Sequence, residues 1–226
     1  MGLIDDLNSI RERDPAAPTF MEVFFGYNGF HALLFHRMNN AIWKLGLRGL
    51  ARFFANFARI LTGIEIHPEA QIGERLFIDH GTGVVIGQTA VIGNDVTIYH
   101  GVTLGGVGRN GERGQKRHPT IDDGAMIGAG AQVLGDVTVG KRAKVGANSV
   151  VTQDIPEGKT ALGIPARVIG GDDKSRGYGL PSREEMEQVT STIDCIVRQM
   201  GEIRKELQLP AEECEEEILK KSKKKA

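Results

Sequence analysis

The chain has 226 residues, with 28 Lys and Arg, 29 Asp and Glu, 30 Gly and 2 Cys. This length fits one globular domain with helical appendages better than two full domains, and a 40% hydrophobic content excludes a wholly disordered chain. A formal net charge of -1 gives no overall basic surface for DNA, RNA or an anionic membrane. We therefore expect partners to be recognised by local chemistry.

The sequence predicts a cytoplasmic protein. No stretch approaches the ~18 apolar residues of a membrane span, and the N-terminus lacks the basic and apolar regions of a secretion signal. Cys195 and Cys214 are too few for a disulfide framework and form no zinc-type pair, so we expect both to be reduced.

Residues 1–62 are predicted to form a small helical domain. Residues 2–12 space their apolar side chains as one helical face, and Asp14 followed by Pro15 ends this helix. Residues 20–61 carry most of the aromatic side chains and predict two or three further helices.

Residues 63–170 contain a six-residue repeat of aliphatic side chains, often followed by Gly. The repeat runs in three blocks: Ile66, Ile72, Ile78, Val84; then Ile86, Ile92, Ile98, Leu104; then Ile121, Ile127, Val133, Val139, Val145, Val151. A period of six fits neither a helix nor a hairpin, and is typical of a parallel β-helix in which 18 residues make one coil. We expect four to five coils, each with its aliphatic side chains stacked inside.

An ordinary parallel sheet is the alternative explanation of the same aliphatic residues. Parallel strands of that kind need crossover helices, and no amphipathic helix of sufficient length occurs between residues 66 and 151. The repeat therefore favours a mainly β fold.

The repeat is interrupted twice. Two residues are added between Val84 and Ile86, and residues 105–119 insert a Gly-rich, basic segment. Such a segment cannot fit inside a coil, so we expect it to leave the β-helix as an excursion loop, where functional residues are commonly found.

Residues 171–226 are predicted to form a helix and a charged, solvated tail. Between Met186 and Leu207, apolar residues alternate spacings of three and four over three heptads. Ile at both core positions favours three or more strands, which would make this helix part of a trimeric coiled coil. A single amphipathic helix packed on its own subunit is the other interpretation.

Several titratable residues occur where the repeat does not need them. These candidates are Glu65, His67, Asp79, His80, His100, Arg117 and His118. His80 and His100 are 20 residues apart, so one coil plus the two-residue insertion puts them on neighbouring coils at one corner.

These candidates indicate acid–base chemistry in a groove. A carboxylate beside an imidazole makes a general base near neutral pH, and two histidines with an arginine can activate a hydroxyl and stabilise an oxyanion. Zinc held by three histidines from a trimer is the competing interpretation. The positive charge of Arg117 counts against it.

The motifs resemble those of the serine O-acetyltransferases, hexapeptide-repeat acyltransferases of cysteine biosynthesis. The resemblance covers RDPA at 13–16, residues 29–47 loosely, and most of 65–170, with the sequences EIHPEAQIG, IDHGTGVVIGQTAVIGNDV, VTLGG, KRHPTI, MIGAGAQVLG and GIPARVIG. It implies a left-handed parallel β-helix and trimers with active sites in the grooves between subunits.

The resemblance also implies residue roles. His80 resembles the general base that deprotonates serine, with Glu65 as its carboxylate partner. Asp14, Asp79, Arg117 and His118 resemble the residues that hold serine, and the excursion loop would bring His118 to the groove of another subunit, where it would also take part in catalysis.

Acetyl-CoA is the implied co-substrate, and no metal is expected. The resemblance places it along the C-terminal coils, with backbone N–H groups near Gly105 and Gly106 at the oxyanion. The full set of expected CoA-binding residues is Gly105, Gly106, Ala129, Lys144, Ala147 and Arg167.

The chain departs from the family pattern in four places. Glu65 stands where the family has Asp, and Gln88 where it often has Glu. The helical domain is about half the usual length, and since it joins trimers in longer members, both a trimer and a dimer of trimers are consistent. The tail lacks the terminal Ile that enters cysteine synthase, so that complex is doubtful here.

Three other functions are consistent with the repeat. The same fold could acetylate homoserine or a sugar hydroxyl, it could be a zinc-dependent trimer similar to the gamma-class carbonic anhydrases, or it could be a structural or partner-binding trimer without activity.

Overall fold

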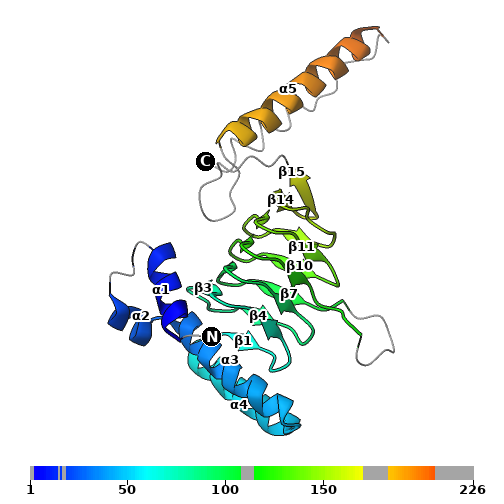
Figure 1. The fold of residues 1–226 in the computed structure, drawn as a ribbon. Coiled ribbons are helices and arrows are strands. Elements are labelled where there is room, and N and C mark those ends of the chain that lie inside the picture. Colours follow the sequence, from blue (N-terminus) through cyan, green and yellow to red (C-terminus); the bar gives the residue numbers. More distant parts are fainter. Residues whose placement is uncertain (1–2, 15, 17–18, 108–114, 170–182, 207–226) are drawn as a thin grey trace, which may run out of the picture. The chain divides into compact units, whose positions relative to one another are not determined.

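The structure is a computed structural model that describes residues 3–14, 16, 19–107, 115–169 and 183–206 (Figure 1). Residues 1–180 form one compact unit, and residues 181–226 form a second. The predicted boundaries after residues 62 and 170 stay predictions. Among the described helices, none has the length and apolar character needed to cross a membrane.

Four helices precede the β region, as the sequence predicts. They are α1 (Leu3–Arg13), α2 (Phe20–Gly26), α3 (Asn28–Lys44) and α4 (Arg48–Thr62). Thr19 and Glu22 form a reciprocal capping box at the start of α2. Gly63, with a φ of 72°, ends α4 in the left-handed conformation that glycine adopts readily.

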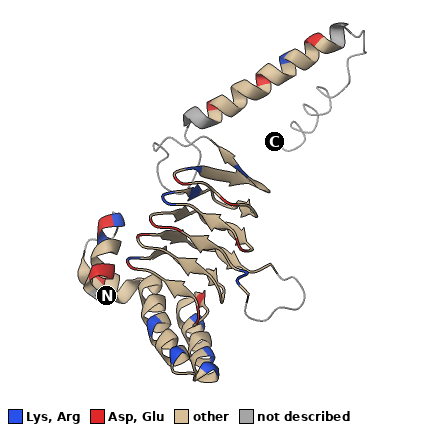
Figure 2. Cartoon of the chain, turned by 45° about the vertical axis from the view of Figure 1, so that its right-hand side comes forward, with Lys and Arg blue, Asp and Glu red and all other residues tan. Residues whose placement is uncertain are grey.

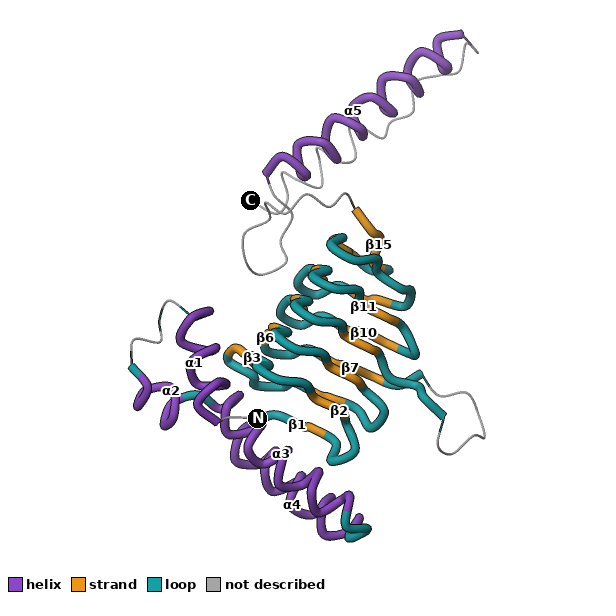
Figure 3. The backbone as a smooth tube through the Cα atoms, viewed as in Figure 1, coloured by secondary structure: helices purple, strands orange, loops and turns teal. Residues whose placement is uncertain are grey.

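Residues 65–169 form a parallel β-helix with three faces (Figure 3). Sheet A contains β1 (Glu65–Ile66), β4 (Val85–Ile86), β7 (Thr103–Gly105), β10 (Gln132–Leu134) and β13 (Val150–Val151). Sheet B contains β2 (Gln71–Ile72), β5 (Val91–Ile92), β8 (Thr120–Ile121) and β11 (Thr138–Val139). Sheet C contains β3 (Phe77–Asp79), β6 (Thr97–Tyr99), β9 (Met126–Ile127), β12 (Lys144–Val145), β14 (Thr160–Gly163) and β15 (Ala166–Ile169).

The repeat residues stack inside the β-helix in the predicted register. On sheet A the stacked column consists of Ile66, Ile86, Leu104, Val133 and Val151. These side chains are at most 6% exposed, so each coil buries its aliphatic residues against the coils above and below. The predicted parallel β-helix is confirmed.

The first insertion lies between Asp79 and Val84, and not between Val84 and Ile86 as the sequence pattern suggests. Val84 lies in register with Val102 on the next coil, because the Val85 N–H donates to Val102 O and the Gly101 N–H donates to Thr82 O. The extra residues are His80 and Gly81, with φ values of 57° and 77°. A side chain at Gly81 would overlap Ile64, so only glycine fits beside the histidine.

The second insertion leaves the β-helix between β7 and β8, as expected (Figure 1). Its first and last residues, 106–107 and 115–119, are described, and the predicted loop residues 108–114 lie outside the described part. The loop departs from the corner between sheets A and B.

The upper edge of sheet C ends in an antiparallel hairpin that the sequence analysis does not predict. β14 continues the parallel pairing from β12, and β15 then folds back on β14 through a turn containing Pro165. The six-residue pattern stops at Val151 and therefore carries no signal for this hairpin.

The helices dock on the first coil of the β-helix. α3 and α4 pack against each other and against β1, and α1 and α3 pack against β3. Basic residues are spread along α3 and α4, whereas α1 carries both acidic and basic residues (Figure 2). The second unit contains α5 (Arg183–Glu206), which confirms a C-terminal helix.

Candidate active site

The corner between sheets C and A, here called the CA corner, carries His80 and His100. Their ring centroids are 5.8 Å apart with an interplanar angle of 79°. His80 lies in the two-residue insertion and is exposed at this corner. The prediction that both histidines share one corner on neighbouring coils is confirmed.

Acidic side chains gather beside this corner. The Tyr27 hydroxyl donates a 2.5 Å hydrogen bond to Asp14 Oδ2. Burial raises the pKa of Asp79, and the charge of Asp14 raises it further, while His80 acts in the opposite direction. Burial and the bond to Asp14 raise the pKa of Tyr27 well above its usual range, so the phenol stays protonated. Two carboxyl groups this close favour a bound cation such as an ammonium group.

Asp14 is held there by the residue before it. The Arg13 guanidinium donates to the backbone oxygens of Asp95 and Val96, at 3.2 Å each, and to that of Arg75. These bonds join the end of α1 to the corner between sheets B and C. They explain how an N-terminal segment contributes a side chain to a site on the β-helix.

The corner between sheets A and B, here called the AB corner, carries Arg117 and His118. His118 is 6% exposed, and its Nδ1 accepts a 3.2 Å hydrogen bond from the Thr89 N–H. Burial lowers the pKa of His118, and the charges of Arg117 and Lys116 lower it further. The neutral ring therefore carries its proton on Nε2, which makes His118 a hydrogen-bond donor.

Two residues that the sequence analysis does not single out position His118. Thr89 Oγ1 accepts hydrogen bonds from the N–H groups of Arg117, at 3.0 Å, and His118, at 3.2 Å. The His118 ring lies directly on Gly87, where any side chain would overlap it. Gly87 occurs in the ordinary repeat pattern, so the sequence gives no signal for this contact.

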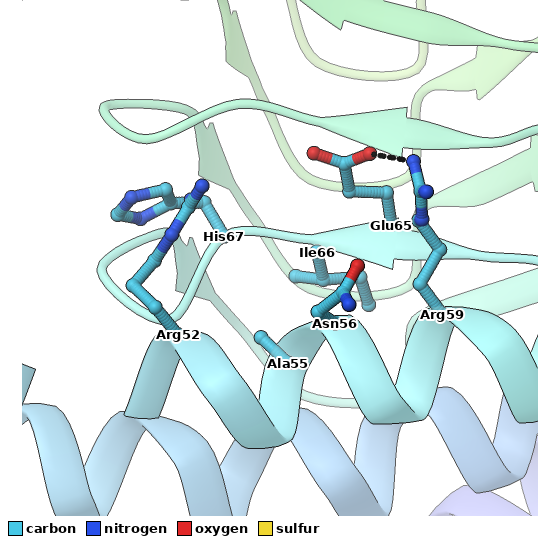
Figure 4. Close-up of a pocket in the computed structure, with 7 residues that line it drawn as sticks. All are labelled: Arg52, Ala55, Asn56, Arg59, Glu65, Ile66 and His67. Carbon is cyan, nitrogen blue, oxygen red and sulfur yellow. Dashed lines mark hydrogen bonds and ion pairs between the residues drawn. The ribbon is translucent and has the colours of Figure 1, made fainter. Parts of the chain in front are cut away.

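Glu65 lines a cavity of about 200 Å³ between α4 and β1 (Figure 4). Its carboxylate pairs with Arg59 at 3.1 Å. His67 lies across the cavity, where its Nδ1 accepts a 3.0 Å hydrogen bond from the Glu69 N–H. Burial, together with the charge of Arg52, lowers the pKa of His67 to about 4. In the single chain the carboxylate of Glu65 is thus held by Arg59, and its predicted role beside His80 stays a prediction.

The expected CoA-binding residues lie in three places. Ala129 and Ala147 continue the CA corner above His100. The Gly130 N–H donates to His100 O, and the Asn148 N–H donates to Ala129 O, both at 2.8 Å.

The other expected CoA-binding residues lie elsewhere. Gly105 and Gly106 lie at the AB corner, where a side chain at Gly106 would contact His118. Lys144 is half-buried on β12, and Arg167 is exposed on β15.

Gln88 also has a local explanation. Its amide Nε2 donates a 2.7 Å hydrogen bond to the Glu69 carboxylate. A glutamate at position 88 would place two carboxylates together there, so the amide suits this chain.

The two corners lie at opposite edges of sheet A. The chain reaches His80 just before β4 and leaves β7 just before the loop that carries His118. One chain therefore contains two incomplete groups of side chains: an acidic and imidazole group at the CA corner, and a basic group at the AB corner. Within the described ranges, no three His, Cys, Asp or Glu side chains are arranged to hold a metal ion.

Comparison with known proteins identifies the family. The family model for the serine acetyltransferase N-terminal region matches residues 2–34, and that for bacterial transferase hexapeptides matches residues 118–153. The serine acetyltransferase of Mycobacterium tuberculosis is 55% identical over 172 residues, covering 76% of this chain and 74% of that protein. The chain belongs to the serine acetyltransferase family.

Other members of the family support this assignment. The serine acetyltransferase of Bacillus pumilus is 46% identical over 205 residues, covering 91% of this chain and 93% of that protein. The structure of Neisseria gonorrhoeae serine acetyltransferase in complex with serine superposes with a TM-score of 0.70 at 43% identity, covering 74% of this chain and 67% of that one.

A serine acetyltransferase solved in complex with CoA gives a TM-score of 0.69 at 43% identity, covering 74% of this chain and 68% of that one. The chain thus spans about two thirds of the length of the solved family members that it matches.

Proposed function

We propose that this protein transfers the acetyl group of acetyl-CoA to the hydroxyl of L-serine, giving O-acetylserine and CoA. The CA corner carries the proposal, because it combines a projecting imidazole, His80, with the carboxyl groups of Asp79 and Asp14. Related proteins solved with serine and with CoA bind the two ligands that this reaction needs. A cytoplasmic location remains part of the proposal.

The serine would be held by charge at both ends. Asp14 and Asp79 are suited to its ammonium group, because an added cation relieves the repulsion between them. Arg117 is suited to its carboxylate in a charge-assisted contact. The hydroxyl would then face His80.

The chemical step is a direct transfer. His80 takes the hydroxyl proton as the serine oxygen attacks the thioester carbon, a C–O bond forms and the C–S bond breaks. CoA leaves as a thiolate, and the imidazolium can return the proton to it. The Nε2–H of His118, with the N–H groups near Gly105 and Gly106, would stabilise the oxyanion. Ala129 and Ala147 leave room for the pantetheine arm along the CA corner.

The site requires more than one copy of the chain. Within one chain, sheet A separates the His80 group from the His118 group. We infer a homotrimer in which the CA corner of one subunit meets the AB corner of the next, as the family resemblance implies. The carboxylate of Glu65 would assist His80 after exchanging its bond to Arg59.

The test is to mix the purified chain with acetyl-CoA and L-serine and to follow the release of free thiol. We expect thiol release that depends on serine, and a loss of about 100- to 10,000-fold in kcat for His80→Ala, the usual cost of removing a general base. The far-ultraviolet circular dichroism of the variant should match that of the unchanged protein.

Two results would contradict the proposal. Faster turnover with homoserine than with serine would change the acceptor, and full activity of His80→Ala would remove the proposed base. Unfolding of His80→Ala would show that this side chain supports the fold; His80→Asn then tests the base in a folded protein.

A further inference from the structure

Helix α5 carries an apolar stripe on its surface. The α5 stripe consists of Met186, Val189, Ile193, Ile196, Met200 and Ile203. These side chains are 47% to 57% exposed, and α5 belongs to the second compact unit of the chain. Six large apolar side chains on one stripe of a helix need a covering surface in water.

The spacing of the stripe favours a coiled coil with copies of the same helix as the covering surface. Intervals of three and four residues alternate without a break, which is the heptad pattern of coiled coils. With Met186, Ile193 and Met200 at position a, the d positions are Val189, Ile196 and Ile203. β-Branched residues at d, with Ile193 also at a, disfavour two strands and favour three or four.

The charges of α5 permit identical helices to lie side by side. Between Met186 and Ile203, the e and g positions that flank the stripe are Thr190, Thr192, Val197 and Gln199, none of which is charged. The charged e and g residues Glu185, Arg204 and Glu206 lie at the two ends of α5. The charged residues Glu187, Asp194, Arg198 and Glu202 occupy the outer heptad positions b, c and f. Between Met186 and Ile203, parallel copies would therefore bring no like charges together at the edges of the contact.

We propose that α5 helices from three copies of the chain form a parallel, three-stranded coiled coil through the α5 stripe. The coil ties the C-terminal ends of three subunits together. Its existence does not depend on the reaction; only its role, which is to keep the CA and AB corners of neighbouring subunits assembled, rests on the proposed function.

Disulfide trapping in the full-length chain tests the coil. In a Cys195→Ser, Cys214→Ser background, Val189→Cys places a thiol at a core d position near the start of α5. In a parallel coil these thiols meet, so mild oxidation should link chains in pairs. At most about two of every three chains can be linked, because one disulfide joins two of three copies.

The chain supplies a matched control. Cys195 is exposed and occupies an outer c position of the same helix. With Cys214→Ser as its only change, the protein should show little cross-linking under the same conditions, because outer positions of neighbouring helices are too far apart for a disulfide.

Three results would overturn the proposal. Equal cross-linking at Cys195 and at Val189→Cys would mean random collision, and linkage of nearly all chains would mean two or four strands. No linkage of Val189→Cys, with linkage when Met200→Cys is added, would mean antiparallel helices. Thiol release from acetyl-CoA is measured on the same samples: cross-linking without activity refutes the proposed function alone, and activity without cross-linking refutes the coil alone.

Discussion

The position of His118 and the ring nitrogen that carries its proton are set by Thr89 and Gly87, two residues that belong to no catalytic motif. The N–H of Thr89 donates to Nδ1 of the ring, and its Oγ1 lies 2.9 Å from the same Nδ1 and accepts from the His118 N–H. One residue thus fixes both the ring and the backbone of His118. Gly87 provides the flat surface on which the ring lies. The imidazole is therefore preorganised as a neutral donor before any ligand binds.

Gly87→Ala tests this arrangement. The added methyl group overlaps the ring, so His118 must turn away from its bond with Thr89. We expect kcat/KM for acetyl transfer to fall by about 100-fold, since a displacement of about 1 Å can have that cost. Gly49→Ala on α4 is the matched control, because a side chain there meets nothing within 4 Å. Equal activity of the two variants would show that His118 needs no fixed position.

The sequence predicts part of the site at this scale. His80 and His100 were expected at one corner because their separation equals one coil plus the insertion. Tyr27 and Thr89 were not expected, because a tyrosine in a helical region and a threonine in a repeat are ordinary residues whose partners are distant in sequence.

At the scale of elements, the side chain of Arg13 joins α1 to the β-helix beside the site. Arg13 bonds to backbone oxygens on two coils and also donates to Ser9 Oγ at 2.6 Å within its own helix. Hydrogen bonds from a charged donor contribute about 1.5 to 3 kcal/mol each in favourable cases. The next residue is Asp14, so the docking of α1 and the placement of this carboxylate are coupled.

Arg13→Lys tests whether the hydrogen bonds of Arg13, and not its charge alone, dock α1 and place Asp14. Lysine keeps the charge but cannot reach several oxygens at once. We expect a lower urea midpoint, equivalent to about 2 kcal/mol, and a higher KM for serine with a smaller change in kcat.

Arg11→Lys is the control on the same helix, where the arginine is exposed. A loss of stability in the control as large as that in Arg13→Lys would show that the bonds to the β-helix do not anchor α1.

At the scale of the whole molecule, buried histidines make stability depend on pH. Burial, assisted by the charge of Arg37, lowers the pKa of His36 to about 4, and burial also lowers the pKa of His67 to about 4 and that of His118. A lowered pKa means that the folded state favours the neutral ring. This contribution to the free energy of unfolding is complete above the pKa of the unfolded state, about 6.5, and is lost as the pH falls toward 4. The raised pKa of Asp79 acts in the opposite direction, because its protonated form suits the fold.

His36→Gln removes the titration of one buried histidine that lies outside the proposed site. Between about pH 7.5 and about pH 5, the unchanged protein should lose about 2 kcal/mol more in free energy of unfolding than the variant does. Urea unfolding at the two pH values measures this difference. If both proteins lost the same amount, His36 would titrate alike in the folded and unfolded states.

The sequence alone determined the repeating architecture. A period of six is a local property, since each aliphatic residue needs only to point inward once per strand, and the stacked column of Ile66, Ile86 and Leu104 follows from it. The same local pattern located the CA corner, because the length of an insertion and the length of a coil fix which residues meet.

Only the tertiary structure decided how the rest of the chain meets the β-helix. Arg13, Tyr27 and Thr89 act through bonds to residues 13 to 84 positions away, and no periodic pattern relates such partners. Sheet A also separates His80 from His118 within one chain, which a one-dimensional repeat does not reveal. The reason is physical: backbone periodicity is set by neighbours in sequence, whereas hydrogen bonding and desolvation depend on neighbours in space.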